Sequence, residues 1–187
     1  MTDTMTRNIV NDLDVDALTQ MVGEIAADPT KAPARFGVTT RWTGQTRSES
    51  KVHAIQAGGE TIERSFSIVA DEPEEMLGTD TAPNPQELLL SALNACMTVG
   101  YVAGAAVRGI TLSHLEIEST GELDLRGFLD LSDAVAPGYP VIDYIVRIGG
   151  NGTPEQFDEI HAAVTATSPN YDNIARAIRM NGRLELV

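Results

Sequence analysis

The chain has 187 residues, of which 42% are hydrophobic, so it can form the core of one domain of ordinary size. Its formal net charge of −14 argues against nucleic acids and anionic membrane surfaces as partners, because both attract Lys and Arg. No apolar run reaches the ~18 residues of a membrane span, and residues 1–16 lack the apolar core of a signal peptide. We therefore expect a cytoplasmic protein.

The chain carries one cysteine, Cys96, and three histidines, His53, His114 and His161. A single cysteine cannot form an internal disulfide, which agrees with a reducing compartment. The histidines lie far apart and lack the spacing of metal ligands. We expect each of them to be a surface histidine or one satisfied by a hydrogen bond, and we expect no metal and no other cofactor.

Residues 1–34 are predicted to form an N-terminal helical extension, and residues 35–187 the main domain. Asp12 or Asp14 is placed to cap a helix that ends near Ala27. Apolar residues recur in this segment at spacings of three and four, which predicts one apolar stripe made of Leu18, Met21, Val22 and Ile25. Such a stripe has to be buried on the main domain or on a partner chain.

From Phe36 to Ala70, short alternating segments are separated by glycines, which predicts an antiparallel meander. Asp71 to Pro85 is acidic and rich in Pro and Gly, so we expect a solvated loop.

The stretch from Pro85 to Ala106 is almost continuously apolar and predicts one long helix that is buried nearly all round. Pro85 suits the first turn of a helix. Gly109 is placed to end the helix. The many alanines and glycines would let other elements approach its backbone closely.

The remaining sequence predicts an alternation of strands and helices, and hence an α+β fold. Ile110 to Asp130 is predicted to form two strands joined by a turn at Gly121. Later elements are a strand over Val141–Ile148, a helix opened by Thr153 and Gln156 and interrupted at Ser168-Pro169, a short helix within Asn173–Met180, and a last strand over Leu184–Val187.

Cys96 lies inside the long apolar helix. A cysteine in such a place is commonly inert packing. The polar residues Asn94 and Thr98 beside it, and Gln86 and Glu87 at the start of the helix, favour a functional site instead.

The run from Asn84 to Cys96 reads Asn-Pro-Gln-Glu-Leu-Leu-Leu-Ser-Ala-Leu-Asn-Ala-Cys. It resembles the central-helix motif of the OsmC/Ohr family of osmotically inducible and organic hydroperoxide resistance proteins. That motif is Asn-Pro-Glu-Glu/Gln-Leu, followed by small residues and Ala-Cys. Ala105–Ile110, Gly121–Gly127 and Pro137–Gly138 resemble later family landmarks in the same order. The resemblance covers roughly residues 36–187.

The resemblance implies a β-sheet wrapped around the long cysteine-bearing helix, an intertwined homodimer, and a thiol peroxidase acting on organic hydroperoxides. In that family an arginine holds the reactive cysteine as a thiolate, and a glutamate holds the arginine. Cys96 matches the peroxidatic cysteine, and Arg47 matches the arginine. Arg41 and Arg64 are alternatives for the arginine.

The sequence departs from the family pattern at two positions. The family glutamate corresponds to Gln86, so Glu87, one residue later, is the candidate for its role. The second, resolving cysteine corresponds to Ser168, which is also placed to cap the last helix. A divergent branch without the second cysteine is therefore implied.

Two functions remain open from the sequence. The first is a peroxidase that uses Cys96 alone with an external thiol reductant. The second is a non-catalytic protein that binds a hydrophobic ligand or senses redox state through Cys96.

Overall fold

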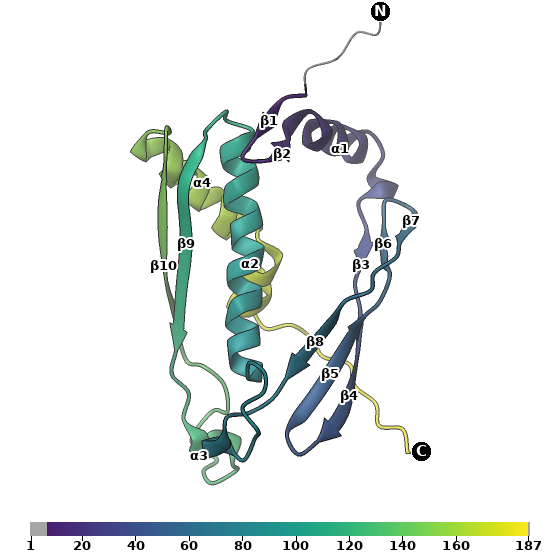
Figure 1. The fold of residues 1–187 in the computed structure, drawn as a ribbon, viewed down its shortest axis with the longest axis vertical. Helices are drawn as coiled ribbons and strands as arrows, with labels where there is room; N and C mark the ends of the chain where they lie inside the picture. Colours follow the sequence, from purple (N-terminus) through teal and green to yellow (C-terminus); the bar gives the residue numbers. More distant parts are fainter. Residues whose placement is uncertain (1–6, 187) are drawn as a thin grey trace, which may run out of the picture. The chain divides into compact units, whose positions relative to one another are not determined.

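The computed structural model describes residues 7–186 and divides into two compact units, Met1–Ser91 and Ala92–Val187. The long helix α2 (Pro85–Ala106) begins in the first unit and continues into the second (Figure 1). Each unit has its own sheets, so each is described separately.

The first unit opens with a hairpin and the predicted helix. Strands β1 (Ile9–Val10) and β2 (Leu13–Asp14) pair across Asn11 and Asp12, which both adopt positive φ. Helix α1 (Val15–Ala27) follows, and Asp14 caps it by accepting a hydrogen bond from the Ala17 amide at 3.0 Å. The prediction of a capped helix ending near Ala27 is confirmed.

The predicted meander of the first unit is two three-stranded antiparallel sheets. One has the order β3-β6-β7 and the other the order β4-β5-β8. The strands are β3 (Ala34–Arg35), β4 (Val38–Gly44), β5 (Arg47–Val52), β6 (Ile55–Ala57), β7 (Glu60–Ile62) and β8 (Ser67–Ala70), and two 3-10 turns lie at Pro29–Lys31 and Glu74–Met76. The register of the β4–β5 pair shifts between Trp42 and Gly44, and Gly44 pairs with Arg47.

The second unit packs helices against a long hairpin. Strands β9 (Leu112–Gly121) and β10 (Ile142–Gly150) pair along their full length, and α4 (Pro154–Thr167) and α5 (Pro169–Ala175) follow. Figure 1 shows this hairpin beside α2 and α4. The buried core of the unit consists of Leu93, Met97, Tyr101, Ala105, Ile110, Ile160 and Val164.

Local signals set the ends of the helices. Gly109 adopts φ 67°, and the amides of Gly109 and Ile110 bond the carbonyls of Ala106 and Ala105, which is a Schellman ending of α2. Thr153 and Gln156 form a reciprocal capping box at the start of α4. Both ends are as predicted.

Three predictions for the second unit are wrong. The segment after Gly121 is not a strand, because β10 pairs with β9 and Asp124 instead caps the short helix α3 (Leu125–Phe128). The final helix starts at Pro169 rather than Asn173. Residues 184–186 form no strand, and Val187 lies outside the described residues.

Helix α2 differs from the sequence prediction in its burial. Leu93, Met97 and Tyr101 form its buried face, whereas Val99 on another face is 69% exposed. Within the second unit, the hairpin and α4 cover one side of the helix, so this unit does not bury it all round. An 18-residue apolar window of this helix has a mean hydropathy of 1.6, enough by length and composition to cross a membrane, contrary to the prediction that no apolar run is long enough. The core helix of a soluble protein passes the same test, so the absence of a membrane partner stays a prediction.

Candidate active site around Cys96

Helices α2 and α4 run antiparallel, and their contacts repeat every four residues. A Cβ added to Gly104 would lie 3.1 Å from the Ile160 Cγ2, and one added to Gly100 would lie 3.0 Å from the Val164 Cγ2. Four residues earlier on α2 and four residues later on α4, this register brings Cys96 to Ser168, the C-cap of α4. The glycines therefore allow the close approach that places the two side chains together.

We expect Gly100→Val to destabilise the protein by about 1–3 kcal/mol, because the new side chain would overlap Val164 in a packed interface. Urea unfolding measures the change. Gly23→Val is the matched control, since Gly23 also lies inside a helix and has nothing within 4 Å of an added Cβ. It should change stability by about 0.5 kcal/mol or less, and equal losses in both variants would contradict the close packing at Gly100.

Ser168 occupies the junction between α4 and α5. Its amide ends α4 by bonding the Val164 carbonyl, and its carbonyl accepts from the Asp172 amide in α5. Pro169 disfavours helical backbone at the preceding residue, and Ser168 has φ −69° and ψ 118°. Ser168 is 5% exposed, so its hydroxyl needs a partner within the protein.

That partner is the cysteine. The Ser168 hydroxyl donates a hydrogen bond to the Cys96 Sγ, with an Oγ–Sγ distance of 3.3 Å. Ser168 holds the N-cap position of α5 as predicted, but its side chain makes no capping hydrogen bond, because the hydroxyl is turned to the sulfur. The prediction that Ser168 acts as a cap is therefore wrong for its side chain.

The surroundings of Cys96 are held by further polar contacts. The Asn170 side chain donates to the Ala92 carbonyl at 2.8 Å, which fixes the start of α5 one turn before Cys96 on α2. Asn94 bonds the Ile117 carbonyl and the Ser119 hydroxyl, and so attaches α2 to β9. The polar residues beside Cys96 thus hold the helix in place, while Cys96 itself is only partly buried.

Arg47 lies in the first unit, at the start of β5. Its Nη1 donates to the Thr81 hydroxyl at 3.1 Å. The two alternative arginines lie elsewhere in that unit: Arg41 is opposite Glu49 on the β4–β5 pair, and Arg64 lies 4.6 Å above the Phe66 ring. Cys96 belongs to the second unit, so the grouping of Arg47 with Cys96 stays a prediction.

Asp71 carries a buried carboxylate that the sequence did not predict. Expected in a solvated loop, it is 1% exposed and accepts hydrogen bonds from the hydroxyls of Thr46, Thr79 and Thr81 and from neighbouring amides. The Thr79 hydroxyl above all, with Thr46 and Thr81, holds the pKa of Asp71 well below its usual value of 3.8, against the opposing effect of burial. Its position directly after a strand was the available signal.

Asp71 should make the protein sensitive to acid. Because its pKa is lowered on folding, its stabilisation is present above the ordinary value of 3.8 and is lost as the pH falls below it. We expect Asp71→Asn to be destabilised at pH 7, with a difference from wild type that shrinks below about pH 4. Urea unfolding at several pH values measures this. Asp80→Asn, at an exposed position in the same loop, is the control, and an equal effect there would contradict the role of Asp71.

Glu87 takes part in the start of α2. Its carboxylate accepts from the Asn84 amide and its own amide donates to the Asn84 side chain, both at 2.8 Å, which is a capping box. Its role as the partner of Arg47 stays a prediction, as does that of Cys96 as the reactive thiol.

The histidines behave as satisfied side chains where their contacts are known. His161 Nδ1 lies 2.5 Å from the Tyr101 hydroxyl, and His53 Nε2 lies 2.7 Å from the Thr39 hydroxyl. Burial, with a smaller contribution from Tyr144, raises the pKa of Tyr101 to about 12, so Tyr101 is neutral at physiological pH. Within residues 7–186, no group of His, Cys, Asp and Glu could hold a metal ion.

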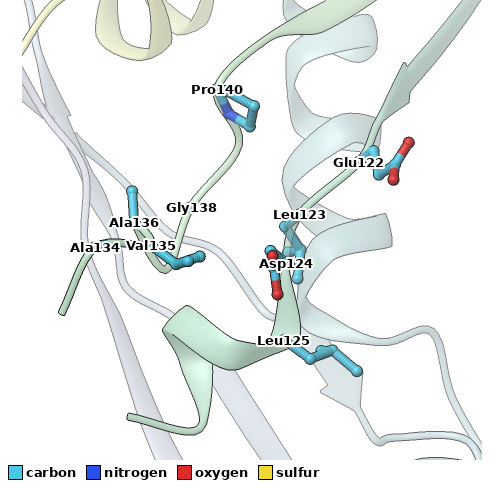
Figure 2. A pocket seen from close by; sticks show the side chains of 9 residues that line it. All are labelled: Glu122, Leu123, Asp124, Leu125, Ala134, Val135, Ala136, Gly138 and Pro140. Atoms are coloured by element: carbon cyan, nitrogen blue, oxygen red, sulfur yellow. The ribbon is translucent and has the colours of Figure 1, made fainter. Parts of the chain in front are cut away.

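A surface hollow of about 750 Å³ lies in the second unit, away from the chemistry proposed for Cys96. Figure 2 shows its walls, Glu122–Leu125 and the loop that includes Ala134–Ala136, Gly138 and Pro140. Asp124, one of its two charged residues, is already paired with Arg126 at 2.5 Å. Cys96 is not among its lining residues, so the hollow is not part of the candidate site.

Comparisons with known proteins place the chain in a family. The model of the OsmC-like protein family matches residues 78–181, which include α2, the β9–β10 hairpin, Cys96 and Ser168. The chain belongs to the OsmC-like family. A search of curated proteins gave no match.

Solved structures support the OsmC-like fold. An OsmC-like protein from Mycoplasma pneumoniae is 18% identical, with a TM-score of 0.59, and the match covers 75% of this chain and 87% of the other. An OsmC-like protein of unknown function from Vibrio cholerae is 13% identical, with a TM-score of 0.53, covering 74% and 92%. At these identities the likeness concerns the fold alone, and it confirms the predicted fold class. The domain boundary at residues 34/35 stays a prediction.

Proposed function

We propose that this OsmC-like protein reduces organic hydroperoxides through Cys96 alone, with an external thiol as reductant. The observation that carries the proposal is the 3.3 Å contact between Cys96 Sγ and Ser168 Oγ. The resemblance matches Ser168 to the second family cysteine, so a hydroxyl lies beside Cys96 at the position where the family pattern has a resolving thiol.

The chemistry begins with the Cys96 thiolate attacking one peroxide oxygen. The S–O bond forms as the O–O bond breaks, and the departing alkoxide takes a proton to become an alcohol. Cys96 is left as a sulfenic acid. The peroxide is reduced and the sulfur is oxidised by two electrons.

Recovery of Cys96 then requires thiols from solution, because serine cannot form a disulfide. One small thiol condenses with the sulfenic acid, giving a mixed disulfide and water. A second thiol attacks that disulfide, releasing the Cys96 thiol and the oxidised small molecule. Turnover should therefore rise with the concentration of the external thiol.

The assembly and setting belong to the same proposal. We infer a cytoplasmic homodimer with no nucleic-acid or membrane partner. Val99 is an exposed apolar side chain on α2, which supports a second copy of the chain as its cover. The formal charge of −14 opposes polyanionic partners. Sedimentation that shows only monomer at micromolar concentration would contradict the dimer.

The decisive experiment treats the intact protein with one equivalent of cumene hydroperoxide and measures its mass. The proposal expects one added oxygen on Cys96, removed when an excess of a small thiol is added, together with one equivalent of alcohol. Protein that keeps its mass while the peroxide persists would contradict the proposal.

The alternative is a redox-sensing or hydrophobic-ligand-binding protein without turnover. Ser168 favours it, because an unresolved sulfenic acid persists, and so does the neutral Gln86 at the position of the family glutamate. Stoichiometric oxidation of Cys96 that small thiols do not reverse catalytically would support this alternative.

A further inference from the structure

We propose that Asp71, acting through the Thr81 hydroxyl, is the anionic anchor that positions Arg47. The consequence for Cys96 rests on the function proposed above, whereas the anchoring itself concerns the first unit alone. Asp71 is then a positioning residue, and the missing family glutamate is replaced by a carboxylate from a different part of the chain.

Two hydrogen bonds link Arg47 to Thr81 and Thr81 to Asp71, and we call this chain the relay. Its hydrogen bonds can run in only one direction. A guanidinium group has donors and no acceptor, so the Thr81 oxygen accepts from Arg47 Nη1 at 3.1 Å. The Thr81 hydroxyl proton is then free to point at the Asp71 carboxylate, to which it donates at 2.9 Å. The carboxylate thus polarises the hydroxyl that receives the arginine, and the relay connects the two charges.

Asp71 is fixed firmly enough to serve as an anchor. Its Oδ2 accepts from the amides of Thr79 and Thr81 and from both of their hydroxyls, and its Oδ1 accepts from the Glu72 amide. Oδ1 also accepts a hydrogen bond from the Thr46 hydroxyl at 2.9 Å, and Thr46 is the residue directly before Arg47 in the chain. The same carboxylate therefore holds the backbone before Arg47 and, through Thr81, the end of its side chain.

The two residues at the start of α2 are less suited to this role. Gln86 has no charge to offer an arginine. Glu87 uses its carboxylate in the capping box with Asn84. Asp71 is the buried carboxylate with a continuous hydrogen-bonded path to the guanidinium of Arg47.

The first test measures the order of the Arg47 side chain directly by the ¹H–¹⁵N NOE of its Nε–H group, assigned by its loss in Arg47→Lys. We expect the signal to report a rigid group in wild type and a mobile one in Thr81→Val and Asp71→Asn. Thr81→Ser, which keeps the hydroxyl, should restore rigidity. Thr61→Val removes a hydroxyl of the same unit that bonds the Gln56 side chain instead of Asp71, and it should leave the group rigid.

The second test follows alkylation of Cys96 by iodoacetamide between pH 5 and pH 9. If Arg47 stabilises the thiolate, Thr81→Val should slow alkylation below pH 7 about as much as Arg47→Met does, by about tenfold. Thr81→Ser should alkylate at the wild-type rate. A general loss of structure would instead expose Cys96 and speed its alkylation.

The outcomes separate the two proposals. A rigid Arg47 in both Thr81→Val and Asp71→Asn overturns the anchor, whatever happens at Cys96. The anchor is also overturned if Arg47 becomes mobile in Glu87→Gln but stays rigid in Thr81→Val. Glutamine at position 87 keeps the capping box and removes only the charge, so this result would make Glu87 the partner of Arg47. Arg47 made mobile by Thr81→Val, with alkylation unchanged in Arg47→Met, supports the anchor and contradicts the role of Arg47 in the proposed function.

Discussion

Ser168→Cys is expected to form a disulfide with Cys96 when the protein is treated with one equivalent of an organic hydroperoxide. The Ser168 oxygen already lies 3.3 Å from the Cys96 sulfur, and the Gly100 and Gly104 contacts hold the two helices in that register. A new thiol in this place can attack the sulfenic acid, releasing water. Loss of two hydrogens in the intact mass, with a linked peptide after proteolysis, measures the bond.

The control for this experiment is Thr167→Cys, which places a thiol one residue earlier at an exposed position. It should leave Cys96 unlinked, or link it far more slowly. If Ser168→Cys stays reduced while Cys96 progresses to sulfinic acid, the two positions do not meet in solution. The match of Ser168 to the resolving position would then be wrong.

Cys96→Ser is expected to abolish hydroperoxide consumption without unfolding the protein. The hydroxyl is close in volume to the thiol, so the packing of α2 against α4 should be kept. A serine hydroxyl is a weak nucleophile without an adjacent base, and it cannot be oxidised to a sulfenic acid. Consumption of cumene hydroperoxide in the presence of dithiothreitol measures activity, and circular dichroism measures the fold.

Ser168→Ala is the matched control, because it changes the same contact from the other side and leaves the sulfur in place. We expect it to keep measurable consumption. Hydroperoxide loss that continues at the wild-type rate in Cys96→Ser would mean that the reactive group lies elsewhere.

The bounds of α2 and the start of α4 could be predicted because the deciding interactions are local. The Asn84–Glu87 and Thr153–Gln156 capping boxes, and the left-handed Gly109, join residues only a few positions apart. The strand predicted after Gly121 failed for the opposite reason. A strand needs a partner, and β10 had already paired with β9, which left Asp124 to cap α3.

Cys96 as the candidate nucleophile, and the family around it, could be recognised from the order of residues in one segment. The environment of Cys96 could not, because Ser168 lies 72 positions away and reaches the sulfur only when α4 packs on the glycine face of α2. The burial of Asp71 could not be predicted either, because an acidic residue in a Pro- and Gly-rich segment is expected to be solvated. Its burial depends on Thr46, 25 positions earlier, and on a loop that folds back to supply Thr79 and Thr81. Local hydrogen bonds can be predicted from neighbouring residues, whereas contacts between distant residues form only when the chain packs.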